Sequence, residues 1–164
     1  MKKTITTEYE SYESVSELSA DEQSLLVLAN EASDRAYAPY SNFYVGAAVL
    51  LENGEIITGN NQENVAYPSG LCAERVAIFA ASSRFPGVPI KTIAITAHSS
   101  NVTLNSPLTP CGGCRQVIAE YETLQKKPIR LLLLGQGGGV IVVNTIEVFL
   151  PLMFKAEGLK KGRK

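Results

Sequence analysis

The strongest constraint on the fold is a helix followed by an apolar strand, a pattern that occurs twice in the second half of the chain. Residues 72–82 and 111–121 are predicted to be helical, and they precede the apolar runs TIAITA (92–97) and IRLLLL (129–134) respectively. Runs of that composition are typical of strands buried on both faces of a sheet. Since a helix that joins two strands of one sheet usually leaves them parallel, part of the sheet is predicted to be parallel.

The first half of the chain predicts a helix followed by an antiparallel hairpin. Ser19 and Glu22 have the spacing of a capping box, and apolar residues follow them at helical spacing. Apolar runs at 43–51 and 55–59 flank Asn53-Gly54, a dipeptide that favours the tight turn of a hairpin. The two runs are therefore expected to pair antiparallel.

A single domain with short extensions is the expected organisation of residues 1–164. A chain of this length is below the size at which chains usually divide into domains. With a further strand at 140–144 and a last helix at 146–150, the prediction is an α/β domain of three layers, α-β-α, around a mixed sheet of about five strands. The acidic N-terminal extension (1–18) and the basic tail (155–164) are expected to be partly solvated and to fray.

Composition and charge exclude several classes of function. Hydrophobic residues make up 45% of the chain, which is enough to offset the ordering entropy of a core and excludes wholesale disorder. A formal net charge of -1 excludes the strong positive field that holds nucleic acid. No apolar run approaches the roughly 18 to 20 residues that span a bilayer. We therefore expect a cytoplasmic protein that has neither nucleic acid nor a membrane as its partner.

The cysteines indicate a metal site. Cys111 and Cys114 stand in the sequence PCGGC, and C-x-x-C spacing lets two thiolates converge on one zinc ion. Cys72 is the remaining soft ligand, and no fourth cysteine exists to complete a zinc ribbon. His98, the only histidine, lies in neither motif and is expected at a loop or a strand end. Three protein ligands leave one position open, which is typical of a catalytic zinc rather than a structural one.

Glu74 lies two residues after Cys72 and has two interpretations. Taken alone, a glutamate at a helix start is more often a residue that interacts with the helix dipole or caps the helix. Beside a catalytic zinc, a carboxylate in a dry pocket instead carries protons between water and substrate, because burial raises its pKa for that task. The combination of Cys-x-Glu with a later Pro-Cys-x-x-Cys favours the proton carrier.

The sequences CAER (72–75) and PCGGCR (110–115) resemble the zinc-dependent cytidine deaminase family. Many members have histidine where this chain has Cys72, so the resemblance is to the small, homotetrameric, three-cysteine branch. Three thiolates on Zn²⁺ leave a net negative charge that weakens the metal as a Lewis acid. Arg75 and the positive ends of the two helices are expected to offset that charge through hydrogen bonds to sulfur, although a surface salt bridge is the alternative for Arg75.

The resemblance extends upstream to PYSNFYVGAA and GNNQENVAY, the second of which contains the family pattern G-x-N-x-E-N. It implies that Asn61 and Glu63 hydrogen-bond the sugar hydroxyls, which favours a nucleoside over a nucleotide. It also implies that Phe43 packs on the pyrimidine face and that Ala73 offers a backbone group to the base. The alternatives are turn residues for Asn61 and Glu63 and a residue of the strand core for Phe43.

Near the C-terminus, FLPLMF resembles the family's L-L-P-x-x-F ending. The resemblance implies that Phe154 reaches the pocket of a neighbouring subunit, so that the active sites of a homotetramer are shared. The alternative is that Phe154 packs on its own domain.

The resemblance implies hydrolytic deamination of cytidine and 2′-deoxycytidine, with Zn²⁺ as cofactor, Glu74 as the catalytic residue and a place in pyrimidine salvage. Deamination of a modified cytosine nucleoside such as blasticidin S is the nearest alternative. Two further alternatives are nucleic-acid editing, which would need a basic channel, and a non-enzymatic zinc module that uses its C-x-x-C to bind a partner. The sequence indicates neither a preference for ribose over deoxyribose nor a role for the acidic extension.

Overall fold

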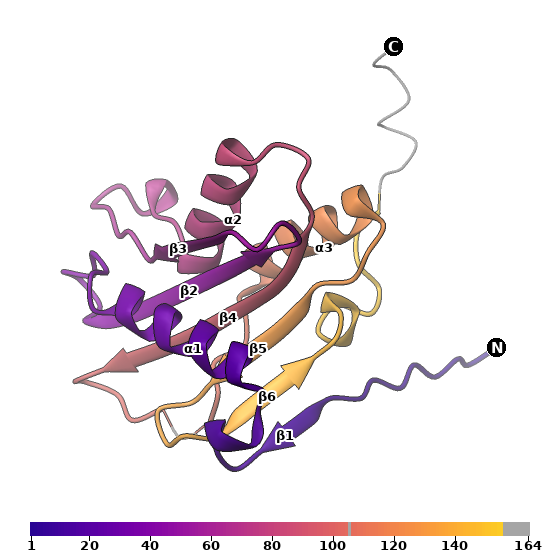
Figure 1. Ribbon diagram of the computed structural model, residues 1–164, viewed down its shortest axis with the longest axis horizontal. Coiled ribbons are helices and arrows are strands. Elements are labelled where there is room, and N and C mark those ends of the chain that lie inside the picture. Colours follow the sequence, from indigo (N-terminus) through magenta and orange to yellow (C-terminus); the bar gives the residue numbers. More distant parts are fainter. Residues whose placement is uncertain (105, 156–164) are drawn as a thin grey trace.

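The computed structural model describes residues 1–104 and 106–155 (Figure 1). Within them a mixed sheet of six strands runs in the order β1-β6-β5-β4-β2-β3. The strands are β1 (Glu10–Tyr12), β2 (Phe43–Leu51), β3 (Ile56–Asn60), β4 (Ile90–Ser99), β5 (Arg130–Leu134) and β6 (Val140–Val143). The helices are α1 (Ala20–Ser33), α2 (Ala73–Arg84) and α3 (Gly112–Gln125), with short 3₁₀ helices η1 (Val15–Glu17), η2 (Tyr67–Ser69) and η3 (Ile146–Val148).

The predicted pairing is confirmed on both sides of the sheet centre. β4 and β5 are parallel, whereas β2 and β3 form an antiparallel hairpin around Asn53-Gly54. Gly54 has φ +87, a left-handed conformation that glycine adopts without a steric penalty. The capping box at the start of α1 is also present, with Ser19 accepting from the Glu22 N–H and Glu22 accepting from the Ser19 N–H.

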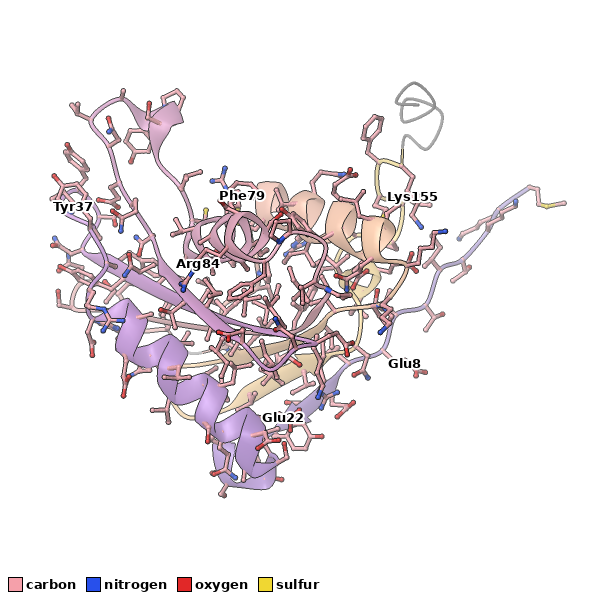
Figure 2. The ribbon with its side chains drawn as sticks, turned by 45° about the horizontal axis from the view of Figure 1, so that its top comes forward. Glu8, Glu22, Tyr37, Phe79, Arg84 and Lys155 are labelled. Atoms are coloured by element: carbon pink, nitrogen blue, oxygen red, sulfur yellow. The ribbon has the colours of Figure 1, made fainter. Side chains whose placement is uncertain are left out.

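Alternation along the central strands sorts the core into two layers. In β4, Ile93 and Ile95 pack with α2 and α3, whereas Ala94 packs with α1 on the opposite face. In β5 the alternation is the same, with Leu132 on the α1 side. Successive side chains of a strand point to opposite faces, so strands apolar on both faces accept helices on both. The three-layer α-β-α prediction is confirmed, and side chains fill the space between the helices and the sheet (Figure 2).

The sheet differs from the prediction by one strand, which lies in the acidic extension. Glu10–Tyr12 forms β1 and pairs antiparallel with β6 at the edge of the sheet. These three residues show no apolar alternation, so their sequence does not predict a strand. Their pairing with β6 depends on backbone groups, which the sequence pattern does not reveal. A smaller difference concerns the last helix, predicted at 146–150 and found as the single 3₁₀ turn η3. Apart from Lys155, the predicted basic tail lies outside the described residues.

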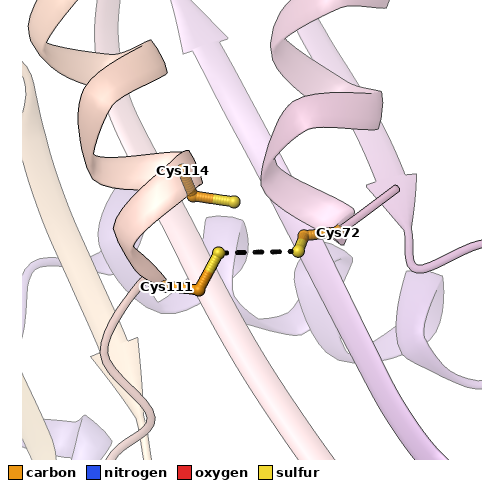
Figure 3. A group of neighbouring side chains, drawn as sticks. All are labelled: Cys72, Cys111 and Cys114. Atoms are coloured by element: carbon orange, nitrogen blue, oxygen red, sulfur yellow. Dashed lines mark hydrogen bonds between the residues drawn. The ribbon is translucent and has the colours of Figure 1, made fainter. Parts of the chain in front are cut away.

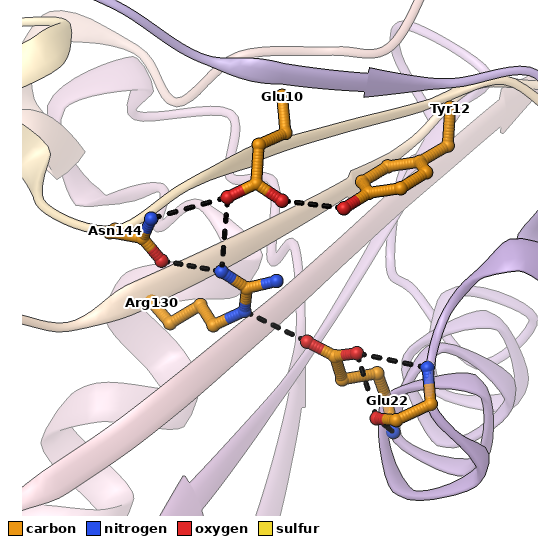
Figure 4. Close-up of polar contacts among 6 residues, drawn as sticks. Glu10, Tyr12, Glu22, Arg130 and Asn144 are labelled. Carbon is orange, nitrogen blue, oxygen red and sulfur yellow. Dashed lines mark hydrogen bonds and ion pairs between the residues drawn. The ribbon is translucent and has the colours of Figure 1, made fainter.

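Arg130 connects β1 to the rest of the molecule (Figure 4). Its Nε donates to Glu22 at 2.8 Å, and its Nη1 donates to the side-chain oxygen of Asn144 and lies 3.7 Å from a carboxylate oxygen of Glu10. Glu10 also accepts from the hydroxyl of Tyr12 at 2.5 Å and from the amide of Asn144 at 3.3 Å. These five side chains, called the Arg130 cluster below, join β1, α1, β5 and the end of β6. Among the described residues, no helix has both the length and the apolarity needed to cross a bilayer.

Candidate functional site

Two helix N-termini bring the three cysteines together (Figure 3). Cys72 is the N-cap residue of α2, Cys111 is the N-cap residue of α3, and Cys114 lies in the first turn of α3. Both helices pack on the same face of the sheet, so residues distant in sequence start from adjacent positions. The positive ends of both helix dipoles therefore point toward the sulfurs, which favours thiolates.

The sulfur positions fit a tetrahedral zinc. The Sγ atoms of Cys72 and Cys111 are 3.7 Å apart, and the three Sγ atoms all lie within 4.8 Å of one another. Zinc–sulfur bonds of about 2.3 Å at tetrahedral angles separate two sulfurs by about 3.8 Å. Among the described residues, the His, Cys, Asp and Glu side chains that could share one ion are these three cysteines alone. The protein therefore offers three ligands and no fourth from these residue types.

The pKa values of Cys72 and Cys114 are shifted in opposite directions. Hydrogen bonding from Cys114 lowers the pKa of Cys72 to about 5, with Arg75 and Cys111 acting in the same direction against the effect of burial. The same contact raises the pKa of Cys114, and so do burial and the nearby Glu74. The Nη2 of Arg75 donates to the Sγ of Cys72 at 3.4 Å, which places a cation beside the predicted ligand set. A zinc ion would remove the remaining thiol protons, because metal binding and deprotonation are coupled.

Glu74 is buried on the first turn of α2 and is only 5% exposed. Burial is the main reason that its pKa is raised, and a backbone hydrogen bond acts in the opposite direction. Its side chain lines the same cavity as Cys72 and Cys111. Glu74 thus places a carboxyl group with little access to bulk water among the residues that line the cavity, together with Cys72 and Cys111.

The cavity has a volume of about 460 Å³, and Cys72 and Cys111 are part of its lining. Its lining includes four further residues that the sequence singled out: Phe43, Asn61, Glu63 and Arg75. Ala73 and Cys114 are fully buried and are not part of the lining. Phe154 is 71% exposed and lies apart from the lining of its own chain, with its carbonyl accepting from Gln116. His98 is near the end of β4, where it stacks on Tyr44 away from the cavity.

The polar atoms of Asn61 and Glu63 are already engaged with the chain. The side-chain oxygen of Asn61 accepts from the Val45 N–H at 2.8 Å, and its amide donates to the Phe43 carbonyl at 2.9 Å. The carboxylate of Glu63 accepts from the hydroxyl of Ser41, and this hydrogen bond is the largest contribution to its lowered pKa. Both side chains thus border the cavity and also bind the segment that carries Phe43.

Sequence reasoning missed part of the cavity wall. Tyr40, Tyr67, Leu71, Leu108 and Thr109 line it as well. Tyr40 and Ser41 belong to the segment PYSNF, in which only Phe43 is predicted from the sequence as a site residue. Leu108 and Thr109 directly precede PCGGC, so their closeness to Cys111 was the available signal.

Known proteins resemble the chain over most of its length. The family model for the cytidine and deoxycytidylate deaminase zinc-binding region matches residues 19–127. A cytidine deaminase from Halalkalibacterium halodurans is 40% identical over 85% of this chain and 98% of its own. The crystal structure of cytidine deaminase from Burkholderia pseudomallei superposes with a TM-score of 0.71 and 34% identity, covering 84% of this chain and 100% of the other.

A blasticidin-S deaminase from Bacillus cereus is more distant, at 29% identity over 84% of this chain and 94% of its own. The converging cysteines fit the zinc-binding region that the family model describes. The chain belongs to the cytidine and deoxycytidylate deaminase family.

Proposed function

We propose that the chain hydrolyses cytidine and 2′-deoxycytidine to uridine and 2′-deoxyuridine and releases ammonia. The observation that carries the proposal is that Glu74, with its buried carboxyl group, lines the same cavity as Cys72 and Cys111, two of the three converging cysteines. The relatives named cytidine deaminase support the same activity. Water supplies the oxygen that bonds to C4 of the base, and the bond between C4 and the exocyclic nitrogen breaks.

Cys72, Cys111 and Cys114 would hold the zinc, which their spacing fits. Bound there, zinc supplies activation of water as a nucleophile at neutral pH. Arg75 donates to the Cys72 sulfur and offsets part of the charge of the thiolates. Together with the helix N-termini, this contact stabilises the ligand set in its deprotonated form.

Glu74 would carry both protons of the reaction. It takes one proton from the attacking water and gives it to N3, which makes C4 more electrophilic. It then moves the second proton of the water to the exocyclic nitrogen, which departs as ammonia. A carboxyl group shielded from bulk water is suited to both transfers, because its proton is exchanged with the substrate rather than with solvent.

The cavity lining supports a nucleoside rather than a nucleotide as substrate. Phe43 would pack on the pyrimidine, the backbone at Ala73 would contact the base, and Asn61 and Glu63 would bind the sugar hydroxyls. Among the described residues that line the cavity, Arg75 is the one lysine or arginine, and it is engaged with Cys72. Among these lining residues no cation is left free to bind a phosphate.

An absorbance assay tests this function directly. The purified, zinc-loaded protein is mixed separately with cytidine, 2′-deoxycytidine, cytidine monophosphate and blasticidin S, and the ultraviolet spectra are followed. We expect conversion of the first two with little change in the others. Rapid turnover of blasticidin S with no turnover of cytidine would contradict the proposal.

We further propose a homotetramer in which Phe154 completes the site of a neighbouring subunit. Phe154 and Leu152 are 71% and 86% exposed on their own chain, which supports a contact made elsewhere. Light scattering measures the subunit number, which should be four. Mixing inactive Glu74→Gln subunits with Phe154→Ala subunits should recover activity, because a shared site can then combine an intact Glu74 with an intact Phe154.

Cytoplasmic pyrimidine salvage is the proposed setting, since a centre of three reduced cysteines needs a reducing compartment.

A further inference from the structure

Phe43 directly follows a turn, residues 38–42, that has an unusual conformation and contacts Glu63. Asn42 has φ 53, in the left-handed region that residues other than glycine rarely adopt. Its N–H donates to the carbonyl of Ala38 at 3.1 Å, and its own carbonyl accepts from the Ser99 hydroxyl at 2.8 Å. The turn is therefore held from β4 as well as from within.

Ser41 forms the connection between the two segments. Its hydroxyl donates to Oε1 of Glu63 and accepts from the N–H of Phe43 at 3.1 Å. The other carboxylate oxygen of Glu63 accepts from the N–H groups of Tyr40 at 2.8 Å and of Ser41 at 3.3 Å. One hydroxyl thus touches the carboxylate predicted to bind the sugar and the backbone of the residue predicted to contact the base.

The number of donors around Glu63 limits what a ligand can still bind. An ionised carboxylate has about four acceptor positions. The Tyr40 N–H, the Ser41 N–H and the Ser41 hydroxyl occupy three of them. The remaining position is the one that can accept from a ligand, and the Ser41 hydroxyl decides the direction in which it points, because it fixes Oε1.

We propose that Ser41 is a positioning residue for sugar recognition, which aims the free acceptor position of Glu63 at a hydroxyl of the nucleoside. The inference rests on the proposed function and deepens it. Ser41 acts through Glu63 and takes no part in the chemistry at C4. Its loss therefore weakens the binding of substrates that carry sugar hydroxyls, and substrates without them are affected far less.

Three variants and two substrates test the proposal. Ser41→Ala removes the hydroxyl, Ser41→Thr keeps it, and Ser99→Ala removes the other side-chain anchor of the same turn without a contact to Glu63. Each is assayed with cytidine and with 2′,3′-dideoxycytidine, which lacks the sugar hydroxyls. The zinc content and thermal unfolding of each variant are measured first, so that KM values are compared only between enzymes that are folded and loaded with zinc.

We expect Ser41→Ala to raise KM for cytidine about tenfold, the size expected for a lost hydrogen bond to a charged group, with kcat within about twofold. KM for the dideoxynucleoside should change by less than about twofold. Ser41→Thr should restore KM for cytidine, and Ser99→Ala should change both KM values by the same factor.

An unchanged KM for cytidine, or an equal rise for both substrates, would overturn the inference while leaving the deaminase activity established. The same selectivity in Ser99→Ala would overturn it too, since the turn as a whole would then be responsible. A wild-type protein that deaminates neither nucleoside would remove the proposed function, and the inference with it.

Discussion

Two polar clusters join distant segments of this molecule, and they differ in what their residues can do. The cysteine centre brings together three side chains that bind a soft metal, at the edge of a cavity that also contains a buried carboxyl group. The Arg130 cluster joins four elements through common polar side chains, and none of them lines that cavity (Figure 4). The first cluster is suited to chemistry and the second to holding the edge of the sheet.

The comparison predicts that changes in the cysteine centre abolish metal binding and activity. Cys111→Ser is expected to have the largest effect, because binding of the metal and folding share one free energy. Zinc content should fall to a small fraction of one equivalent, activity should be lost, and the melting temperature should drop. Metal analysis and thermal unfolding of the purified variant measure these quantities. A variant that retains a full equivalent of zinc would show that Cys111 is not a ligand.

Glu74→Gln separates chemistry from metal binding at the same centre. The amide cannot carry protons, so kcat for cytidine should fall by about three orders of magnitude or more. Zinc content should stay the same, since Glu74 is not among the converging ligands. Glu31→Gln, on the exposed surface of α1, is a matched control that should keep full activity. Near-normal turnover of metal-loaded Glu74→Gln would refute the role.

The difference between the clusters also explains what the sequence could predict. The chain has only three cysteines, and each lies at or near the start of a predicted helix. The sequence alone therefore predicts that Cys72 shares a metal site with Cys111. The capping box and the hairpin at Asn53-Gly54 are local, and they were predicted for the same reason. Their signals are confined to a few neighbouring residues.

The missed contacts are made between common residues that the fold brings together. Glu10 and Arg130 are 120 positions apart by their numbers, and no pattern in either neighbourhood indicates the pairing. The bonds of Asn61 to the backbone of β2 were missed because they depend on the register of the hairpin end. Ser41 lies in the same motif as Phe43, but its hydrogen bond to Glu63 joins residues 22 positions apart and depends on the fold.

Breaking the second cluster should cost stability and spare activity. Arg130→Ala leaves the carboxylates of Glu10 and Glu22 without their cation, and we expect a loss of about 1 to 3 kcal/mol in the free energy of unfolding. Urea unfolding measures the loss, and kcat at saturating cytidine should stay within about twofold. Lys127→Ala removes a more exposed pair with Glu52 and should cost less than about 1 kcal/mol. Equal losses in the two variants would show that the cluster adds nothing beyond a surface ion pair.

The smallest expected effect is the dependence of that stability on pH. Burial alone would raise the pKa of Glu22, but hydrogen bonds from Ser19 and Arg130 outweigh it and hold the pKa below its ordinary value of 4.5. A carboxyl group with a lowered pKa in the folded state contributes stability above its unfolded value, and that contribution is lost as the pH falls through the folded one. Urea midpoints of the wild type should therefore fall more than those of Arg130→Ala as the pH drops below 4.5. Because Glu22 is partly solvated, the difference should be only a few tenths of a kcal/mol. Parallel pH profiles would mean that Glu22 titrates alike with and without Arg130, and the stabilising role of the cluster would then lie in the hydrogen bonds that Tyr12 and Asn144 form with Glu10 and Arg130.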